Sequence, residues 1–474
     1  MIALTIAELA SVVGGELAGI SEDDSRSSVV DGPVVTDSRE SVPGSLYVAR
    51  VGEHADGHDF VPAAARLGAV AALVTRPVRG VACVVVADTQ DAFATLSREV
   101  LRRVRGLEVI GITGSSGKTS TKDLLGAVLS GVGPTVAPVG SYNSEVGVPL
   151  TVCRVTHETR FLVVEMGARG VGHVRYLTQI APPRIGMVLN VGTAHLGEFG
   201  SREAIGRAKT ELVQSLPTDG VAVLNADDDI VRAMAGSCAG RVVLVGEAID
   251  AQVRASAVEV DDQGCPSFDV LTPVGTGHVR LGLVGRHHVG NALAVLAVAL
   301  ELGMSLPDAL SALEQARPAS RWRMEVTERP DGVTVINDAY NANPDSMRAA
   351  LSALERIGRG RRTWAVLGSM LELGPESDSL HAEVGAEAVT RGVSELLVVG
   401  DLARAMVDGA ASALDPHGAP HAATTVRHVP DAATAEELLR RELRRGDVVL
   451  FKSSRDAGLR LLGDRLTAPE EDPT

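Results

Sequence analysis

Residues 108–130 read EVIGITGSSGKTSTKDLLGAVLS, an apolar run, a Gly/Ser loop and a helix-like stretch in succession. The apolar run predicts a buried strand over 108–113, and the last part predicts a helix from about Lys118 to Ser130. Strand, glycine-rich loop and helix in this order form the arrangement in which proteins hold nucleotide phosphates. The segment therefore predicts an α/β fold with a phosphate-binding loop.

Further aliphatic runs follow along the chain, and each ends in polar residues or glycine. Buried parallel strands have this appearance, because both faces of the sheet are covered. The runs that we interpret as strands of the same sheet are FLVVEMG (161–167), RIGMVLNVG (184–192), GVAVLNAD (220–227) and RVVLVG (241–246). They predict a parallel sheet like that of phosphate-loop ATPases.

The pattern of strand-like and helix-like stretches restarts twice, which divides the chain into three predicted domains, 1–104, 105–315 and 316–474. Before residue 105, strand-like and helix-like stretches alternate, with a polar segment at 21–33 that we expect to be a loop. Between 253 and 284 the pattern becomes short strands with Gly/Pro turns, which predicts a small antiparallel insertion. After residue 316, strands alternate with helices again, which predicts a Rossmann-like C-terminal domain.

Composition and charge exclude several classes of protein. Hydrophobic residues make up 45% of the 474 residues and charged residues 22%, which is ordinary for a folded protein and not for a disordered one. The net charge of −15 argues against a nucleic-acid-binding protein or one that grips an anionic membrane. It does not argue against a local phosphate site, which needs only amides and a few cations.

The cysteines and the apolar segments indicate a cytoplasmic protein. The four cysteines lie far apart in the sequence and form no CxxC pair, which is typical of free thiols in a reducing compartment. The first residues lack the basic start of a signal peptide, and no apolar run approaches the ~20 residues of a membrane helix. We expect a cytoplasmic monomer without a membrane span.

The loop residues each have a chemical reason to bind a nucleotide. Residues 114–119 (Gly114, Ser115, Ser116, Gly117, Lys118, Thr119) fit the short pattern GxxGKT, whereas Ile112 breaks the longer GxxxxGK[ST]. Backbone amides and Lys118 suit phosphates, and the Thr119 hydroxyl suits the accompanying Mg²⁺. The alternative is a glycine-rich turn with a surface lysine, and even a true phosphate loop does not tell a GTPase from a kinase or a ligase.

Three more residues in the central part are candidates for catalysis. Glu165 ends a predicted strand, where a carboxylate points into the ligand crevice and suits Mg²⁺; it could also be a solvated strand end. His195 follows another strand of the sheet and is, taken alone, more typical of a loop residue. Lys209 lies in a helical stretch and is, taken alone, more typical of a solvated lysine.

The C-terminal part adds an arginine and a polar segment. Arg323 stands where the third domain would begin, and an arginine from a second domain often neutralises charge in phosphoryl transfer. The segment DAYNANPDSM (338–347) is dense in hydrogen-bonding side chains, namely Asp338, Tyr340, Asn341 and Asn343. An Asn-rich turn is the simpler explanation of that segment.

Together these motifs resemble the Mur ligases of peptidoglycan synthesis along essentially the whole chain. The segments that carry the resemblance are TDSRESVPGSLYVAR (36–50), DGHDF (56–60), GITGSSGKTSTKD (111–123), SYNSEVGVPLT (141–151), VVEMGARGVGHV (163–174), LNVGTAHLGEFGSREAI (189–205), AKTEL (208–212), RWRMEV (321–326), DAYNANPDSM (338–347), LGSMLELG (367–374) and FKSSR (451–455). YNANPDSM and LGSMLELG point to the branch whose amine substrate is D-alanyl-D-alanine.

The resemblance implies an ATP-dependent ligase that joins D-alanyl-D-alanine to UDP-N-acetylmuramoyl-tripeptide through an acyl phosphate. The central domain would bind ATP and two Mg²⁺ ions, and Lys209 would carry a carbamate. The implied nucleotide residues are Gly114 to Ser120, Asn291, Arg323 and Asp338, and the implied metal ligands are Thr119, Glu165, His195 and Lys209. Lys118, Glu165, His195, Lys209 and Arg323 would be the catalytic group.

The resemblance also implies where the two other substrates bind. Ser38, Arg39, Asp56 and Gly57 would bind the uridine diphosphate, and Tyr340, Asn341 and Asn343 the incoming amine. The chain departs from the family pattern at Ser144, His288 and Ser453, where an asparagine, an asparagine and a glycine are usual.

Three alternatives stay open from the sequence. A sister amide ligase, such as the tripeptide-forming enzyme or folylpolyglutamate synthase, would differ in its amine substrate. A nucleotide-switched binding protein would hydrolyse ATP without an amine acceptor, and a small-molecule kinase would release a stable phosphorylated product.

Overall fold

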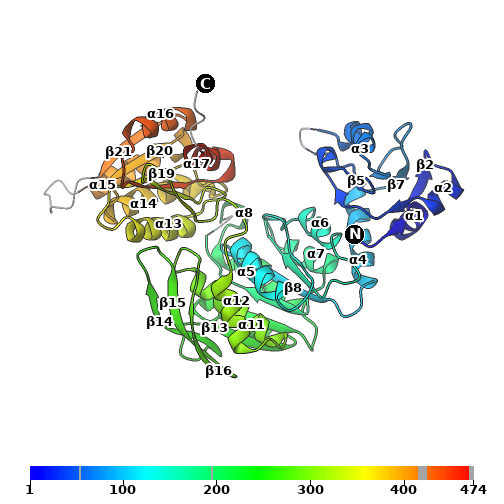
Figure 1. The fold of residues 1–474 in the computed structure, drawn as a ribbon, viewed down its shortest axis with the longest axis horizontal. Coiled ribbons are helices and arrows are strands. Elements are labelled where there is room, and N and C mark those ends of the chain that lie inside the picture. The colour runs from blue at the N-terminus through cyan, green and yellow to red at the C-terminus, as the bar shows by residue number, and fades with distance from the viewer. Residues whose placement is uncertain (53–54, 194–195, 415–423, 469–474) are drawn as a thin grey trace.

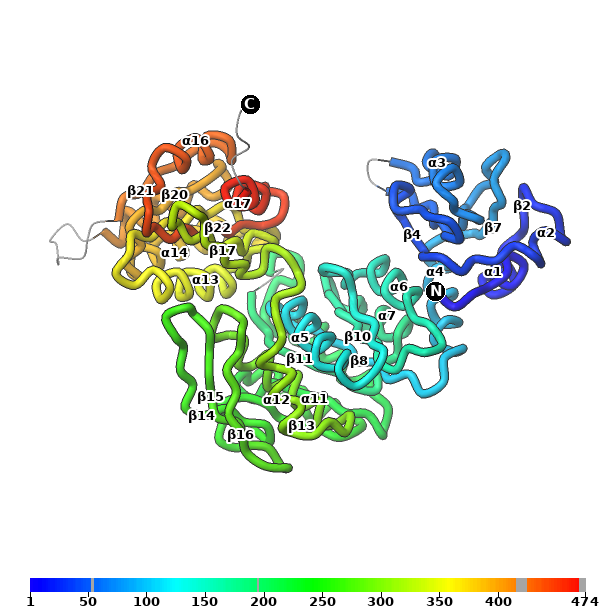
Figure 2. Tube along the Cα trace, in the orientation of Figure 1, coloured from blue at the N-terminus to red at the C-terminus, as the bar shows by residue number. Residues whose placement is uncertain are grey.

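The computed structural model describes all residues except 53–54, 194–195, 415–423 and 469–474. The chain forms three lobes, which follow one another from blue through green to red in the ribbon (Figure 1) and in the Cα tube (Figure 2). We call them the first lobe (strands β1 to β7), the central lobe (β8 to β16) and the third lobe (β17 to β22). Among the described residues, no helix is long and apolar enough to span a bilayer.

The first lobe is built on a five-stranded sheet of order β2-β7-β6-β5-β4, in which only β2 is antiparallel to its neighbour. The predicted loop at 21–33 is wrong, because Ser21 caps a short helix and residues 29–30 pair with residues 4–5. The elements are β1 (Leu4–Thr5), α1 (Ile6–Val13), β2 (Glu16–Ala18), α2 (Glu22–Ser27), β3 (Val29–Val30), β4 (Val34–Val35), η1 (Ser38–Glu40), β5 (Leu46–Val48), η2 (Gly57–Phe60), α3 (Val61–Arg66), β6 (Ala71–Val74), β7 (Cys83–Val85) and α4 (Thr89–Arg102).

The central lobe contains a nine-stranded sheet of order β16-β15-β14-β13-β12-β11-β8-β10-β9. Strands β8 to β14 run parallel, and β15 is antiparallel to both of its neighbours, β14 and β16. The predicted antiparallel insertion is confirmed, and its strands continue the parallel sheet through the β13–β14 pair. The strands are β8 (Glu108–Thr113), β9 (Thr135–Val136), β10 (Phe161–Glu165), β11 (Ile185–Val188), β12 (Val221–Asn225), β13 (Arg241–Gly246), β14 (Val253–Val260), β15 (Pro266–Thr272) and β16 (Gly275–Arg280).

Helices cover both faces of the central sheet, as alternating strand residues require. In β10, Leu162 and Val164 face one apolar core, and Phe161 and Val163 face the other. The first of these cores continues into the first lobe, because α4 packs on α6 and α7. The helices are α5 (Lys118–Ser130), α6 (Gly147–Val152), α7 (His173–Ile180), α8 (Leu196–Phe199), α9 (Arg202–Gln214), α10 (Asp229–Ala233), η3 (Met234–Ser237), α11 (His288–Glu301) and α12 (Leu306–Gln315).

The third lobe has a six-stranded sheet of order β17-β18-β22-β19-β20-β21, parallel except for the edge strand β17. The edge strands β17 and β21 carry polar residues and were not predicted. The elements are β17 (Glu325–Glu328), β18 (Thr334–Asn337), α13 (Pro344–Ile357), β19 (Thr363–Leu367), η4 (Gly374–Glu376), α14 (Ser377–Thr390), β20 (Glu395–Val399), η5 (Asp401–Ala403), α15 (Ala405–Ala413), β21 (Thr425–Val429), α16 (Ala432–Glu442), β22 (Val448–Lys452), η6 (Arg455–Ala457) and α17 (Leu459–Thr467).

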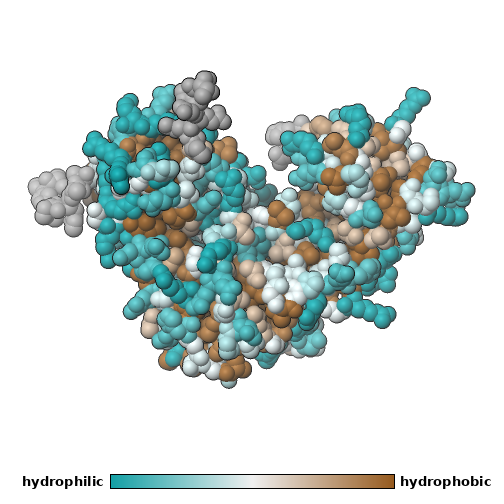
Figure 3. Space-filling view, viewed as in Figure 1, coloured by the Kyte–Doolittle hydropathy of each residue, from teal (hydrophilic) through white to brown (hydrophobic). Residues whose placement is uncertain are grey.

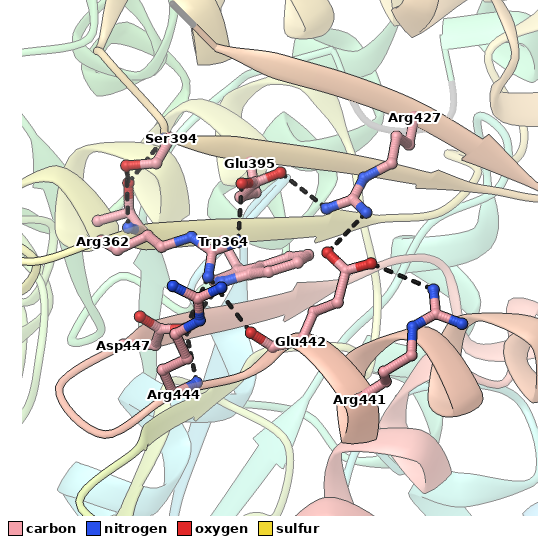
Figure 4. A network of polar contacts seen from close by, with 10 residues as sticks. Arg362, Trp364, Ser394, Glu395, Arg427, Arg441, Glu442, Arg444 and Asp447 are labelled. Atoms are coloured by element: carbon pink, nitrogen blue, oxygen red, sulfur yellow. Dashed lines mark hydrogen bonds and ion pairs between the residues drawn. The ribbon is translucent and has the colours of Figure 1, made fainter. Parts of the chain in front are cut away.

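A polar network closes the amino-terminal edge of the third sheet (Figure 4). The buried ring of Trp364 has the guanidinium groups of Arg362 and Arg427 at 4.6 and 5.2 Å from its centre. Glu395 accepts hydrogen bonds from both arginines, and Asp447 accepts one from the Trp364 indole N–H. This edge lies opposite the carboxyl ends of the strands, so the network stabilises the lobe away from the site described next.

Candidate functional site

The predicted phosphate loop lies at the carboxyl edge of the central sheet, between β8 and α5. Strand β8 has β10 on one side and β11 on the other, so later strands of the chain are added to the sheet on both sides of β8. Such switch points are where open α/β sheets bind ligands. Gly117 is the N-cap of α5 and no side chain caps the helix, which leaves its first amides available to an anion.

Gly117 has a left-handed backbone (φ +79°) and lies directly against Asn291 of α11. A Cβ atom at this position would approach Asn291 Oδ1 to 2.9 Å, so the loop needs glycine here for two reasons. The structure thus places the predicted nucleotide residue Asn291 beside the loop.

Asn190, which follows β11, fastens the loop and was missed in the sequence. Its Oδ1 accepts hydrogen bonds from the amides of Ser115 (3.0 Å) and Ser116 (2.9 Å), and its Nδ2 donates to the Ser116 carbonyl (3.2 Å). The signal that could have found it is its place at the carboxyl end of a strand next to β8. The turn is therefore held in shape by the protein itself.

Lys118 lies within the loop and folds back on it. Its Nζ donates to the Gly114 carbonyl at 2.6 Å. Burial lowers the pKa of Lys118, and the charge of Arg323 lowers it further, whereas Glu165 raises it. Lys118 is half-buried and its Nζ contacts the loop backbone, so it is not the fully exposed surface lysine of the alternative.

Glu165 is fully buried at the end of β10 and is the centre of a polar cluster. Its carboxylate accepts hydrogen bonds from Thr119 Oγ1 (3.1 Å), Ser141 Oγ (3.0 Å) and Asn143 Nδ2 (2.9 Å). The alternative of a solvated strand end is therefore wrong. Ser141 and Asn143 belong to the segment SYNSEVGVPLT, and the sequence did not identify them individually.

Lys209 in α9 is also buried, with 4% of its surface exposed, so the alternative of a solvated lysine is wrong. Burial lowers its pKa well below the ordinary value, and the nearby charge of Lys118 lowers it further. No carboxylate of the described residues forms an ion pair with it. His195, the third predicted residue of this group, lies outside the described residues.

Arg323 connects the third lobe with the phosphate loop. Its Nη2 lies 3.3 Å from Thr119 Oγ1, and its guanidinium group lies 4.4 Å from the centre of the Tyr340 ring. The segment before it is fastened to α5, because the Ser320 amide donates to Asp123 and Lys122 Nζ donates to Ser320 Oγ. Two lobes therefore meet at Thr119.

The other predicted residues of the third lobe lie at the carboxyl end of β18. Asp338 accepts hydrogen bonds from Lys452 Nζ (2.6 Å) and from the Met324 amide, so its carboxylate is engaged within the lobe. Lys452 is buried, also donates to the Asn341 carbonyl, and was missed in the sequence. Asn343 caps α13 by accepting from the Ser346 amide, which is the simpler role considered for this segment.

The four predicted residues of the first lobe follow two neighbouring parallel strands. Ser38 and Arg39 lie in η1 after β4, and Asp56 and Gly57 lie at η2 after β5. Asp56 accepts from the amide and ring of His58, and the space beside Gly57 is filled by the Arg50 backbone. No hydrogen bond among the described residues joins the four to the phosphate loop, and the surface is hollowed between the first and third lobes (Figure 3).

The three departures from the family pattern have local explanations. Ser144 is exposed and accepts, at 3.4 Å, from the Val146 and Gly147 amides at the start of α6. Ser453 is buried, and its hydroxyl donates to the Ser454 carbonyl. His288 is buried beside Asn291, and burial lowers its pKa well below the ordinary value.

Comparison with known proteins agrees with this geometry in all three lobes. The matching family profiles are the Mur ligase family catalytic domain (residues 33–111), the Mur ligase middle domain (112–299) and the Mur ligase glutamate ligase domain (322–455). The chain belongs to the Mur ligase family. The resemblance to the Mur ligases that the motifs indicated is therefore confirmed.

The matches between this Mur ligase and similar proteins extend over nearly its full length. A UDP-N-acetylmuramoyl-tripeptide–D-alanyl-D-alanine ligase of Mycobacterium tuberculosis is 47% identical, and the match covers 99% of each chain. A crystal structure of MurF from Acinetobacter baumannii has a TM-score of 0.86 at 33% identity, covering 98% of this chain and 99% of that one. MurF ligase from Thermotoga maritima, in complex with ADP, has a TM-score of 0.76 at 28% identity, covering 91% and 96%.

Proposed function

We propose that this Mur ligase joins D-alanyl-D-alanine to UDP-N-acetylmuramoyl-tripeptide at the expense of ATP. The observation that carries the proposal is the meeting at Thr119 of a phosphate loop, a buried strand-end carboxylate and an arginine from the third lobe. The names of the similar proteins support the choice of substrates.

The reaction needs ATP because a carboxylate is a poor electrophile. In the proposed sequence, the terminal carboxylate of the tripeptide attacks the γ-phosphorus of ATP, so that an acyl phosphate forms and ADP leaves. The free amine of D-alanyl-D-alanine then attacks the acyl carbon and loses a proton, and inorganic phosphate leaves. Lys118 and Arg323 neutralise the charge of the transferred phosphoryl group. The contact between the third lobe and the loop excludes water, which would hydrolyse the acyl phosphate.

The residues around Glu165 fit a Mg²⁺ ion. A carboxylate and a hydroxyl 3.1 Å apart at the helix start are the hard oxygen ligands that this ion prefers. We propose that Thr119 and Glu165 hold one Mg²⁺, and that His195 and Lys209 serve a second. When bound, the ions would neutralise negative charge on the phosphates.

We propose a carbamate on Lys209. Only a neutral amine reacts with CO₂, and burial together with Lys118 favours the neutral form of this side chain. The carbamate would convert the neutral amine of Lys209 into an anion, and the positive charge of Lys118 would stabilise that anion.

The remaining expectations become parts of the same proposal. Residues 1–104 would bind the uridine diphosphate through Ser38, Arg39, Asp56 and Gly57. Residues 105–315 would bind ATP through the loop from Gly114 to Ser120 and through Asn291. Residues 316–474 would supply Arg323 and Asp338 to the nucleotide and Tyr340, Asn341 and Asn343 to the amine.

We further propose that the enzyme acts in the cytoplasm as a monomer. The four cysteines lie among the described residues and are free, which is typical of a reducing compartment. The net charge of −15 gives no support to nucleic acid as a partner.

The test is phosphate release from ATP with UDP-N-acetylmuramoyl-tripeptide present, with and without D-alanyl-D-alanine, and with mass detection of the product. We expect release that requires both substrates and yields the UDP-N-acetylmuramoyl-pentapeptide. Ligation of a single amino acid instead would assign the chain to a sister activity. Release without any amine acceptor would indicate a nucleotide switch, and a stable phosphorylated product would indicate a kinase.

A further inference from the structure

Two aromatic rings and four guanidinium groups gather on the third lobe, next to the point where Arg323 reaches Thr119. The rings of Trp322 and Tyr340 are stacked, with centres 6.3 Å apart and an angle of 21° between their planes. The guanidinium groups lie over them: Arg321 (5.0 Å) and Arg460 (5.4 Å) over Trp322, and Arg323 (4.4 Å) and Arg455 (5.9 Å) over Tyr340. We call these six residues the arginine–aromatic cluster.

The cluster has more positive charge than its surroundings neutralise. Asp464 forms an ion pair with Arg321 and also accepts from the Trp322 indole N–H. Arg323 points to Thr119, and Arg460 donates to the backbone carbonyl of Arg455.

Arg455 is the cation of the cluster that faces solvent without a partner. It is exposed, at the start of η6, and its guanidinium group makes no hydrogen bond or ion pair among the described residues. The adjacent carboxylate of Asp456 forms no ion pair with it. An exposed guanidinium group held over a ring, with its donors unused, is suited to a planar anion such as a carboxylate.

Arg455 lies close to the residues that would hold the transferred phosphoryl group. Arg323 and Arg455 lie over the same ring, so their guanidinium carbons are at most about 10 Å apart. A phosphate bound at the loop is served by Arg323 and Lys118. A dipeptide spans roughly 7 Å from its amine to its carboxylate, and a single amino acid roughly half of that. A dipeptide whose amine lies near the transferred phosphoryl group can therefore place its carboxylate within reach of Arg455.

We propose that Arg455 binds the carboxylate of the incoming dipeptide. Tyr340 holds the guanidinium group in place through its ring face. This inference rests on the proposed function, because it assigns the carboxylate subsite of the amine substrate. Arg455 is a substrate-binding residue in this role and takes no part in the transfer of the phosphoryl group.

The test compares D-alanyl-D-alanine with D-alanyl-D-alaninamide, which keeps the amine and lacks the carboxylate charge. Both are assayed with the wild type, with Arg455→Gln, and with Arg321→Gln as the matched control. Arg321 is an exposed cation of the same cluster, but it lies over the other ring and is already paired with Asp464. Arg455→Lys tests whether charge alone suffices.

A charge-assisted hydrogen bond predicts that Arg455→Gln lowers kcat/KM for D-alanyl-D-alanine by about 10- to 100-fold. The value for the amide should stay within about twofold of the wild type, as should the KM for ATP, and Arg321→Gln should change neither. Arg455→Lys should recover part of the loss. An equal loss with both amines, or a loss confined to the KM for ATP, would overturn the assignment. A wild type that ligates neither amine would refute the proposed function itself, which is a distinct result.

Discussion

Replacement of Asn190 by alanine tests whether the protein itself shapes the phosphate loop. The side chain makes three hydrogen bonds to the loop backbone, two from the amides of Ser115 and Ser116 and one to the Ser116 carbonyl, and it accepts a longer one (3.4 Å) from the Ser116 hydroxyl. The Ser115 amide keeps a second acceptor in Asn190→Ala, because it also donates to the backbone carbonyl of residue 190 at 3.1 Å. The Ser116 amide and the Ser116 carbonyl each lose their hydrogen bond to the side chain of residue 190.

Two hydrogen bonds are therefore lost outright, at about 1 kcal/mol each. The ordered loop should become less favourable by about 2 kcal/mol, which corresponds to roughly 30-fold in its equilibrium with other loop conformations. In the proposed function ATP binds the ordered loop, so part of its binding free energy would be used in the variant to order the loop. We expect ATP to bind about 10- to 30-fold more weakly.

The assay is calorimetric titration with ATP in the absence of the other substrates, so that no turnover occurs. Asn225→Ala is the matched control, because Asn225 ends the adjacent strand and also makes two hydrogen bonds, to the Leu189 carbonyl and from the Asp227 amide. Both variants should lose thermal stability, and only Asn190→Ala should lose ATP affinity. Unchanged ATP binding in Asn190→Ala, or an equal loss in both variants, would refute the reasoning.

Four more changes have defined outcomes. Lys118→Ala should abolish ATP turnover with an unchanged circular dichroism spectrum; an active variant would remove the lysine from phosphoryl transfer. Lys209→Ala should be inactive and should regain activity with short carboxylic acids, and an inactive variant that no acid rescues would count against the carbamate. Hydrogen bonds, chiefly from the His58 amide, hold the pKa of Asp56 well below its usual range, so the ionised form stabilises the fold above about pH 4 and this contribution is lost as the pH falls. Asp56→Asn should therefore lower Tm at neutral pH and not in strong acid, as thermal melts across the pH range can show. Glu395→Gln should reduce stability by about 1–2 kcal/mol in urea unfolding and leave kcat unchanged, because the Trp364 network lies at the far edge of the sheet.

Local pattern predicted the elements that position the site. The helix from Lys118 to Ser130 and the strand over 108–113 are confirmed residue by residue, because strong hydrophobic periodicity and a glycine-rich turn are signals of neighbouring residues. The prediction of a loop over 21–33 is wrong because residues 29–30 form a strand that pairs with residues 4–5, and no local pattern reveals this pairing. The edge strands β17 and β21 were missed for a related reason, since edge strands carry polar residues that resemble loops.

The sequence by itself determined the α/β class, the phosphate loop and the family, because each depends on residues close together in the chain or on motifs in a fixed order. The tertiary structure alone decided the states of single side chains. Lys209 and Glu165 resemble solvated residues in the sequence, and burial within the central lobe makes one a lysine of lowered pKa and the other a buried carboxylate. The roles of Lys452 and Arg455 depend on partners more than a hundred residues away, and that of Asn190 on the loop that follows a neighbouring strand. Burial and charge at a point depend on everything that packs around it, and that is a property of the folded chain.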